Sequence, residues 1–177
     1  MSEMCHHLIE RDTQLVYKTQ RAPQPGVLTK TDTFYENTSQ NCDNFKQKNG
    51  FTLEPTSQDE ADFPLAFSIL IYKDVEQFAR LLRAVYRPQN FYCIHVDAKS
   101  PTNVSVAVES IVSCFDNVFM ASQSVRVIWG HISVLEPEMV CMRDLLKRPN
   151  WRCLSIFQPA ARLSREAGFC EAYSFFI

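Results

Sequence analysis

Two short segments, Ile71–Lys73 and Asp97–Lys99, hold the residues of this sequence best placed to contact a ligand. Each one ends an apolar run with strand character, Leu65–Tyr72 and Phe91–Val96. In open parallel sheets, ligands bind beyond the carboxyl ends of the strands, so both segments are candidate binding positions. Asp97, which is followed by Ser100-Pro101, equally fits a plain turn that caps the next helix, because such residues are ordinary turn formers.

The elements that position these segments form a β-α-β unit. Leu65–Tyr72 is apolar without alternation, which fits a strand buried on both faces or a buried helix, and its length favours the strand. Phe91–Val96 has the same character. Between them, Asp74 can cap a helix whose apolar residues have helical spacing: Val75, Phe78, Ala79, Leu82 and Val85. This connection is long enough for a right-handed parallel crossover.

The later elements continue the α/β pattern. Ser100-Pro101 is expected to cap and begin a helix, and Val118–Ala121 and Val125–Trp129 are expected to be strands. A further helix begins at Glu136-Pro137 and ends before Pro149-Asn150. The sequence therefore predicts an α/β domain with a mainly parallel sheet over residues 61–151.

The two ends of the chain have a different character. Residues 1–60 are polar and are predicted to form an irregular arm, with a clear break at Ala22-Pro23-Gln24-Pro25-Gly26. In residues 152–177 the apolar residues follow neither a helical nor a strand period, so this tail is not assigned to the sheet.

Composition excludes several classes of protein. The chain has 177 residues, enough for one domain, and its apolar fraction of 46% is sufficient for a core. A net charge of −2 gives no electrostatic reason to bind nucleic acid or an anionic membrane. With four glycines, no glycine-rich phosphate loop can be written, which argues against Walker ATPases and dinucleotide dehydrogenases. No apolar run is long enough to span a bilayer, and the N-terminal residues do not form a signal peptide.

Seven cysteines without a Cys-x-x-Cys pair fit structural disulfides in an oxidising compartment, and free buried cysteines are the competing interpretation. Two glycosylation sequons begin at Asn37 and Asn103, the first in a polar stretch and the second in the first turn of a predicted helix. His6 and His7 are adjacent, so their side chains point apart on any regular element. No metal site is predicted.

Three contiguous blocks resemble the β-1,6-N-acetylglucosaminyltransferases that make core 2 and I branches on glycans. They are Asp62-Phe-Pro-Leu-Ala-Phe-Ser-Ile, Leu81-Leu-Arg-Ala-Val-Tyr-Arg-Pro-Gln-Asn-Phe-Tyr-Cys-Ile-His-Val-Asp-Ala-Lys-Ser and Ser113-Cys-Phe-Asp-Asn-Val-Phe-Met-Ala-Ser-Gln. The resemblance covers residues 40–152. It implies a GT-A-like domain in the Golgi that transfers N-acetylglucosamine from UDP-N-acetylglucosamine to O-glycan or lactosamine acceptors, with inversion and without a divalent metal or other cofactor.

By matching position, the resemblance implies donor-nucleotide contacts for seven residues: Leu70, Ile71, Tyr72, Asp97, Ala98, Lys99 and Trp129. These positions include the two strand-end segments that the sheet argument already identifies as candidate binding positions. Tyr72 departs from a histidine that is usual in core 2 enzymes, and Trp129 departs from a tyrosine, which puts donor affinity in question. Without the family, Trp129 fits an ordinary core position equally well.

The resemblance also pairs four cysteines, Cys42 with Cys114 and Cys93 with Cys141, and places Asn37 at a glycosylated position. It gives Cys5 a partner that this sequence does not contain, and it assigns no counterpart to Cys153 or Cys170. After Ser133 the chain departs from the family pattern, with Val134, Pro137 and Glu138 at substituted positions.

No catalytic residue can be assigned. Family members continue after the tryptophan that corresponds to Trp151 with an acceptor site, a glutamate that acts as general base and basic residues for the diphosphate. Residues 152–177 match none of this, and Glu109, Glu136 and Glu138 do not match the base. We therefore expect a donor-nucleotide half that cannot catalyse alone. The alternatives are a non-catalytic nucleotide-binding or interaction fragment, or a fragment that does not fold stably.

Overall fold

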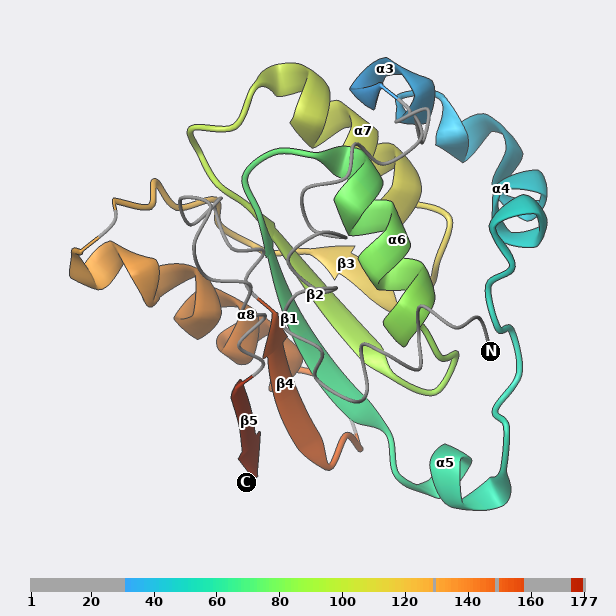
Figure 1. Ribbon diagram of the computed structural model, residues 1–177. Helices are drawn as coiled ribbons and strands as arrows, with labels where there is room; N and C mark the ends of the chain where they lie inside the picture. Colours follow the sequence, from blue (N-terminus) through green and yellow to red (C-terminus); the bar gives the residue numbers. More distant parts are fainter. Residues whose placement is uncertain (1–30, 129, 149, 158–172, 177) are drawn as a thin grey trace, which may run out of the picture.

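The computed structural model describes residues 31–128, 130–148, 150–157 and 173–176. In these residues, five strands form one sheet in the order β3-β2-β1-β4-β5 (Figure 1). Strands β1 to β4 are mutually parallel, and β5 pairs antiparallel with β4. The strands are β1 (Leu65–Ile71), β2 (Phe91–Val96), β3 (Val118–Met120), β4 (Cys153–Phe157) and β5 (Tyr173–Phe176). The predicted α/β class with a mainly parallel sheet is confirmed.

Helices cover both faces of this sheet. Helices α6 (Val75–Val85) and α7 (Thr102–Val112) lie on one face, and α8 (Glu136–Leu145), which follows the 3-10 turn η2 (Ile132–Val134), lies on the other (Figure 1). The predicted β-α-β unit is confirmed, including its cap, because the Asp74 side chain accepts a hydrogen bond of 3.0 Å from the Gln77 N–H.

The core has two apolar layers, one on each face of the sheet. On the α6 and α7 side, β1 and β2 contribute Phe67, Ile69 and Ile94, all under 9% exposed. On the α8 side, Ala66 packs with Leu145 and Leu154. Successive residues of β1 are therefore buried on opposite faces, which explains why this strand is apolar without alternation.

The predicted strand at Val125–Trp129 is wrong for the residues that the structure describes. Residues 125–128 have no strand partner there, because side chains bind their backbone instead. The Val125 N–H donates to His95 Nε2 at 2.9 Å, and the Ile128 N–H donates to Ser133 Oγ at 2.9 Å. Trp129 lies outside the described residues.

The helix predicted to begin at Ser100-Pro101 begins one position later. Pro101 is the residue that precedes the helix, and Thr102 is the first helical residue. The Ser100 hydroxyl donates to the Tyr72 carbonyl oxygen at 2.7 Å and so does not cap α7.

Part of the unassigned tail completes the sheet. Residues Cys153–Phe157 pair in parallel with β1, from Leu65 opposite Cys153 to Ile69 opposite Phe157. Cys153 and Leu154 are buried. The described ends of the tail therefore belong to the sheet, and residues 158–172 lie outside the description.

The described part of the N-terminal arm is helical, which differs from the irregular arm that the sequence predicts. It contains α3 (Asp32–Tyr35), η1 (Thr38–Asn41), α4 (Cys42–Asn49) and α5 (Gln58–Asp62). Phe45 and Phe51 are buried against Phe115, with ring centroids 6.5 Å and 4.9 Å apart. These aromatic contacts hold the arm on the domain, whereas residues 1–30 lie outside the described chain.

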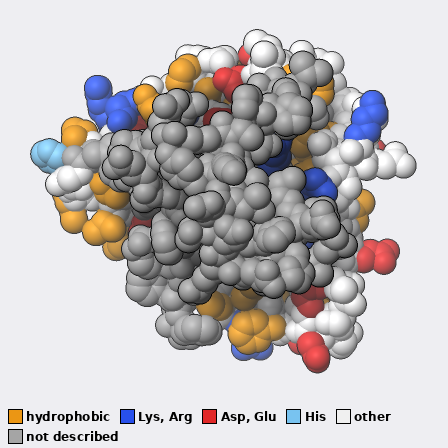
Figure 2. Space-filling model, viewed as in Figure 1, with side chains coloured by type: hydrophobic (Ala, Val, Ile, Leu, Met, Phe, Trp, Pro, Cys, Tyr) orange, Lys and Arg blue, Asp and Glu red, His pale blue; other side chains and the backbone are white. Residues whose placement is uncertain are grey.

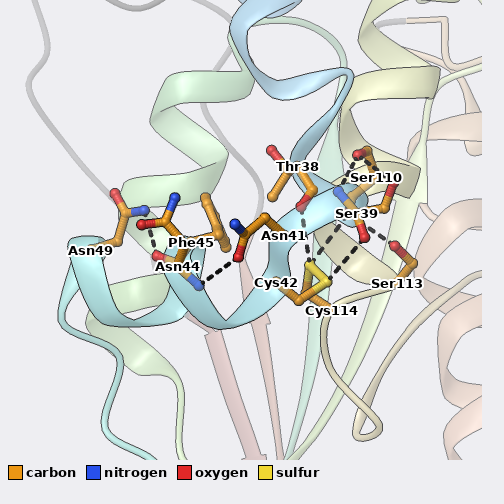
Figure 3. The surroundings of a disulfide bond; sticks show 10 residues. All are labelled: Thr38, Ser39, Asn41, Cys42, Asn44, Phe45, Asn49, Ser110, Ser113 and Cys114. Atoms are coloured by element: carbon orange, nitrogen blue, oxygen red, sulfur yellow. Dashed lines mark hydrogen bonds between the residues drawn. A yellow bond between two sulfur atoms is a disulfide. The ribbon is translucent and has the colours of Figure 1, made fainter.

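Both predicted disulfides are present. Cys42–Cys114 joins α4 to the end of α7, with 5.1 Å between the Cα atoms (Figure 3). Cys93–Cys141 joins β2 to α8, with 5.5 Å between the Cα atoms. They close loops of 72 and 48 residues. In the chain-entropy account, each lowers the free energy of folding by about 4 kcal/mol.

Candidate functional site

The carboxyl ends of β1 and β2 are tied together by hydrogen bonds. The Asp97 N–H donates to the Ile71 carbonyl oxygen at 2.8 Å, and the Ser100 hydroxyl donates to the Tyr72 carbonyl oxygen at 2.7 Å. The two segments that the sequence singles out therefore form one continuous surface at this edge of the sheet.

Asp97 is buried at the centre of this surface, with 7% of its area exposed. Its Oδ1 atom accepts the Lys99 N–H at 2.8 Å, so the carboxylate does stabilise a turn, as the plain interpretation of this residue proposes. Its Oδ2 atom lies 3.7 Å from Lys99 Nζ. This second oxygen keeps hydrogen-bonding capacity for a ligand, because an ionised carboxylate accepts about four hydrogen bonds.

An exposed aromatic ring with two cations lies beside this carboxylate. Tyr72 is 41% exposed. The Lys73 and Lys99 ammonium groups lie 5.8 Å and 5.3 Å from the centroid of its ring, within the range of cation–π attraction. The strand ends therefore combine a ring, two positive charges and a buried carboxylate.

The other predicted positions contribute differently. Ile71 is 3% exposed and faces the α6 and α7 core, so its side chain does not reach this surface. Leu70 is half-buried, and Ala98 is exposed, with its N–H donating to the Val125 carbonyl oxygen at 3.0 Å. Trp129 falls outside the described residues. Three predicted side chains thus come together: Tyr72, Asp97 and Lys99.

His95 supports this edge of the sheet and was missed in the sequence. It is 1% exposed, and its Nε2 accepts the Val125 N–H. Nε2 is therefore unprotonated, and burial lowers the pKa of His95 against a smaller opposing effect of Asp97. Its position inside an apolar strand, two residues before Asp97, is the sequence signal that could have identified it.

Residues 121–125 run beside the end of β2 and are fixed at several points. The Ser124 hydroxyl donates to the Val96 carbonyl oxygen at 2.7 Å. On α8, Asp144 accepts the Ser122 N–H at 2.7 Å and pairs with Lys147 at 2.8 Å. Burial raises the pKa of Asp144, but the Lys147 and Ser122 hydrogen bonds outweigh it and leave the pKa lowered. The segment is thus held by α8 and β2 together.

The two sequon asparagines are both exposed. Asn37 precedes η1, and its Oδ1 accepts from the Gln40 amide at 3.3 Å. Asn103 lies in the first turn of α7, and its amide donates to Asp32 Oδ2 at 3.2 Å. Attachment of a glycan at either position stays a prediction.

Among the residues that the structure describes, no group of three or more His, Cys, Asp or Glu side chains is arranged to hold a metal ion. In the same part of the chain, the helices are too short or too polar to cross a bilayer.

The strand order reverses at β1, which has β2 on one side and β4 on the other. Ligands of open α/β sheets bind at the carboxyl ends of the strands where the order reverses, and Tyr72 directly follows β1 at this point. The fold defines an α/β domain with a mainly parallel sheet, consistent with part of a GT-A-like fold.

Comparison with known proteins agrees with this class. The family model described as Core-2/I-Branching enzyme matches residues 65–159. A beta-1,3-galactosyl-O-glycosyl-glycoprotein beta-1,6-N-acetylglucosaminyltransferase of bovine herpesvirus 4 is 47% identical over 125 residues, which cover 70% of this chain and 28% of the viral protein. The enzymes numbered 3 under the same name from Bos taurus and Homo sapiens are 49% and 48% identical over 117 residues, covering 66% of this chain and 27% of each enzyme.

The chain therefore belongs to the Core-2/I-Branching enzyme family. It spans less than a third of the length of the curated relatives it matches. The match includes all seven residues to which the resemblance gave donor contacts.

Proposed function

We propose that this chain supplies the donor-nucleotide half of a β-1,6-N-acetylglucosaminyltransferase and binds the UDP part of UDP-N-acetylglucosamine. The proposed contacts are Leu70, Ile71, Tyr72, Asp97, Ala98, Lys99 and Trp129. The observation that supports this most is the grouping of the buried Asp97 carboxylate, the Tyr72 ring and two ammonium groups at adjacent strand ends.

Each of these groups suits one part of a uridine diphosphate. The Oδ2 of Asp97, which is 3.7 Å from Lys99 Nζ, can also accept a hydrogen bond from a ribose hydroxyl or from the uracil N–H. The exposed ring of Tyr72 offers an apolar surface for the nucleoside. Lys73 and Lys99 place positive charge near the diphosphate, which suits a site that works without a divalent metal.

Sugar transfer needs more than this site. An inverting reaction requires a carboxylate that takes the proton from the acceptor hydroxyl while its oxygen attacks the anomeric carbon. Glu109 lies on α7, and Glu136 and Glu138 lie on α8, so none of these three follows the end of β1 or β2. We therefore propose that residues 1–177 bind donor but transfer no sugar by themselves. By relation to the family, the acceptor is an O-glycan or lactosamine and the site of action is the Golgi.

Calorimetric titration with UDP tests the donor site. The unmodified chain should give a saturable signal, and Asp97→Asn should weaken binding about 10- to 100-fold, because one hydrogen bond to a charged group contributes about 1.5–3 kcal/mol. Asparagine retains an oxygen that can accept the Lys99 N–H, so the turn is preserved. Asp116→Asn is the matched control, since Asp116 is exposed just before β3, at the other end of the sheet.

The absence of a UDP signal in a chain that unfolds cooperatively would refute the donor site. Catalysis is tested separately, with radiolabelled UDP-N-acetylglucosamine and a core 1 acceptor. We expect no transfer above a protein-free control. Measurable transfer that is lost in Asp97→Asn would refute the proposal that this chain is inactive alone while supporting its donor site.

A further inference from the structure

Helix α8 carries apolar side chains on two opposite faces. Its inner face is buried against the sheet through Val140, Cys141 and Leu145. Its outer face exposes Leu135 at 50% and Met139 at 58%. An ordinary surface helix has one apolar stripe and a polar outer face, so the second stripe requires a separate explanation.

The outer stripe extends beyond the helix at both ends. Ile132 in η2 is 72% exposed, and Leu146 just after α8 is 67% exposed. Figure 2 shows hydrophobic side chains gathered at the side of the molecule that η2 and α8 occupy. Leu135 and Leu146 directly flank α8, and with Met139 their spacing corresponds to a and d positions of a heptad repeat, whereas Ile132 lies in the 3-10 turn before them. Contiguous exposed apolar surface of this kind marks an interaction site.

Two residues of opposite charge, Glu136 and Arg143, border the stripe and are seven positions apart in the sequence. Glu136 lies in the first turn of α8 and Arg143 lies in its last turn. Both are exposed, and within the described residues neither forms an ion pair in its own chain. On a heptad, both residues occupy the e position beside the a and d stripe, where charges select the partner and its orientation.

We propose that the stripe Ile132, Leu135, Met139 and Leu146 is a self-association surface on which a second copy of this chain packs with its α8 antiparallel. In a two-fold antiparallel pair, Glu136 of each copy lies beside Arg143 of the other copy, which gives two opposite-charge contacts. In a parallel two-fold pair the e positions of the two helices lie on opposite sides of the seam, so Glu136 would not reach Arg143 of the other copy and both opposite-charge contacts would be absent. The midpoint between the two charges lies next to Met139, at the centre of the stripe.

The predicted complex is weak. One helix of 10 residues with its flanking turns gives a contact at the low end of protein interfaces, so we expect a dissociation constant of about 1–100 μM. Sedimentation velocity over a concentration series that spans this range should show the mass average rising from that of the monomer toward that of the dimer.

A charge swap makes the test specific to the antiparallel pair. Glu136→Arg places two arginines beside each other at both contacts, and Arg143→Glu places two glutamates there, so each single variant should weaken association about tenfold. The double variant Glu136→Arg with Arg143→Glu restores both opposite-charge contacts and should associate as the unmodified chain does. Met139→Lys should abolish association, because it buries an ammonium group at the centre of the contact.

Glu109→Arg is the control, since Glu109 is exposed on α7, on the other face of the sheet. It should leave the dissociation constant unchanged. Thermal unfolding of every variant verifies that the fold is retained. The proposal is refuted if the chain stays monomeric throughout the series, if Met139→Lys associates normally, or if the double charge swap remains as weak as the single variants.

Discussion

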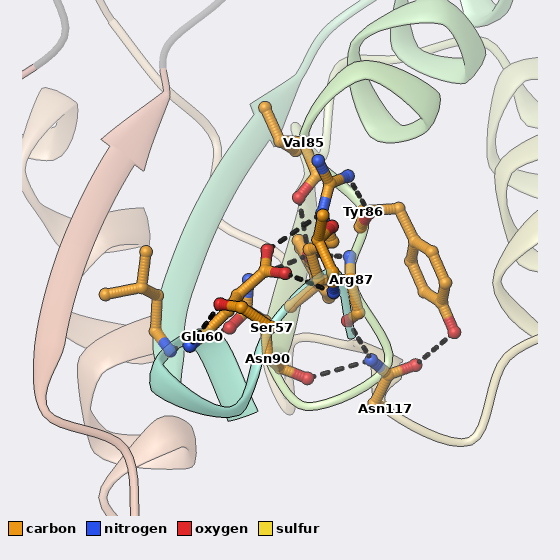
Figure 4. Close-up of polar contacts among 10 residues, drawn as sticks. Ser57, Glu60, Val85, Tyr86, Arg87, Asn90 and Asn117 are labelled. Atoms are coloured by element: carbon orange, nitrogen blue, oxygen red, sulfur yellow. Dashed lines mark hydrogen bonds and ion pairs between the residues drawn. The ribbon is translucent and has the colours of Figure 1, made fainter. Parts of the chain in front are cut away.

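At the amino-terminal end of the parallel strands, Asn90 and Asn117 point their side chains at backbone groups of the protein (Figure 4). At the carboxyl end, in contrast, Tyr72, Lys73 and Lys99 are exposed. The Asn117 amide lies within 3.3 Å of the carbonyl oxygens of Arg87, Pro88 and Asn90, and its oxygen accepts the Tyr86 hydroxyl. At the amino-terminal end these two asparagines are used in hydrogen bonds within the protein, whereas at the carboxyl end Tyr72, Lys73 and Lys99 stay exposed beside the buried Asp97.

This difference separates stabilising residues from binding residues. Buried polar groups lower stability when their partners are removed, whereas exposed groups can be replaced with little change in folding free energy. Substitutions of the buried polar groups should therefore affect stability, and those of the exposed groups at the carboxyl end should affect ligand affinity.

The largest effect on stability is expected for Asn117→Ala. It removes the donor to the loop carbonyls and the acceptor of the Tyr86 hydroxyl, so the free energy of unfolding should fall by about 2 kcal/mol. Urea unfolding of the purified chain measures it. UDP affinity should not change, because Asn117 precedes β3, at the end of the sheet opposite the proposed site.

The neighbouring exposed residue provides the control. Asp116→Ala should change the free energy of unfolding by less than about 0.5 kcal/mol. Equal losses for the two variants would show that the amino-terminal network does not stabilise the fold as proposed.

A smaller effect is expected from the protonation of His95. Its folded-state pKa is lowered by burial, so the unfolded chain binds more protons in the pH range below about 6.5. The free energy of unfolding should therefore decrease as pH falls from 7.5 to 5.5, with a slope of at most about 1.4 kcal/mol per pH unit for one proton. In His95→Gln this slope should be reduced, because an amide oxygen can accept the Val125 N–H at any pH in the range.

Urea unfolding of both proteins at several pH values measures this effect. If His95→Gln keeps the full slope, another group is responsible for the pH dependence of stability. In that case the neutral His95 ring does not hold residues 121–125 against β2. If His95→Gln loses the slope, the protection factor of the Val125 amide proton, which corrects for the intrinsic exchange rate at each pH, should also fall in the unmodified chain at the lower pH, because its acceptor is protonated.

Local patterns were sufficient to predict the β-α-β unit. The limits of α6 follow from Asp74, whose side chain caps the helix, and from the periodic apolar residues, so contacts within a few residues determine them. The strand at Val125–Trp129 was wrong because the acceptor of the Val125 N–H is His95, 30 residues earlier in the chain. Hydrogen bonds of this kind leave no periodic signal.

The tail and the arm lack a periodic signal for a related reason. Strand β4 has five residues, too few for a period to be distinguished, and it is a strand because it pairs with the edge of β1 that β2 leaves free. The helix α4 is polar along most of its length, and it is held by Phe45 and by the Cys42–Cys114 disulfide. At the candidate site, the positions of Tyr72 and Asp97 followed from strand ends alone. The place of His95 in an apolar strand singles it out in the sequence, whereas its partner, the Val125 N–H, is visible only in the fold.

The smallest effect on stability is expected at the carboxyl end, for Tyr72→Ala. The ring is exposed and its cation–π contacts to Lys73 and Lys99 are weak at such a site, so the free energy of unfolding should change by less than about 1 kcal/mol. UDP affinity should nevertheless fall about fivefold or more, as expected when about 1 kcal/mol of ring contact is lost from a binding surface. Phe34→Ala is the matched control, because Phe34 is an exposed aromatic on α3. If Tyr72→Ala unfolds much more easily and binds UDP normally, Tyr72 belongs with the stabilising residues and the division between the two ends of the sheet fails.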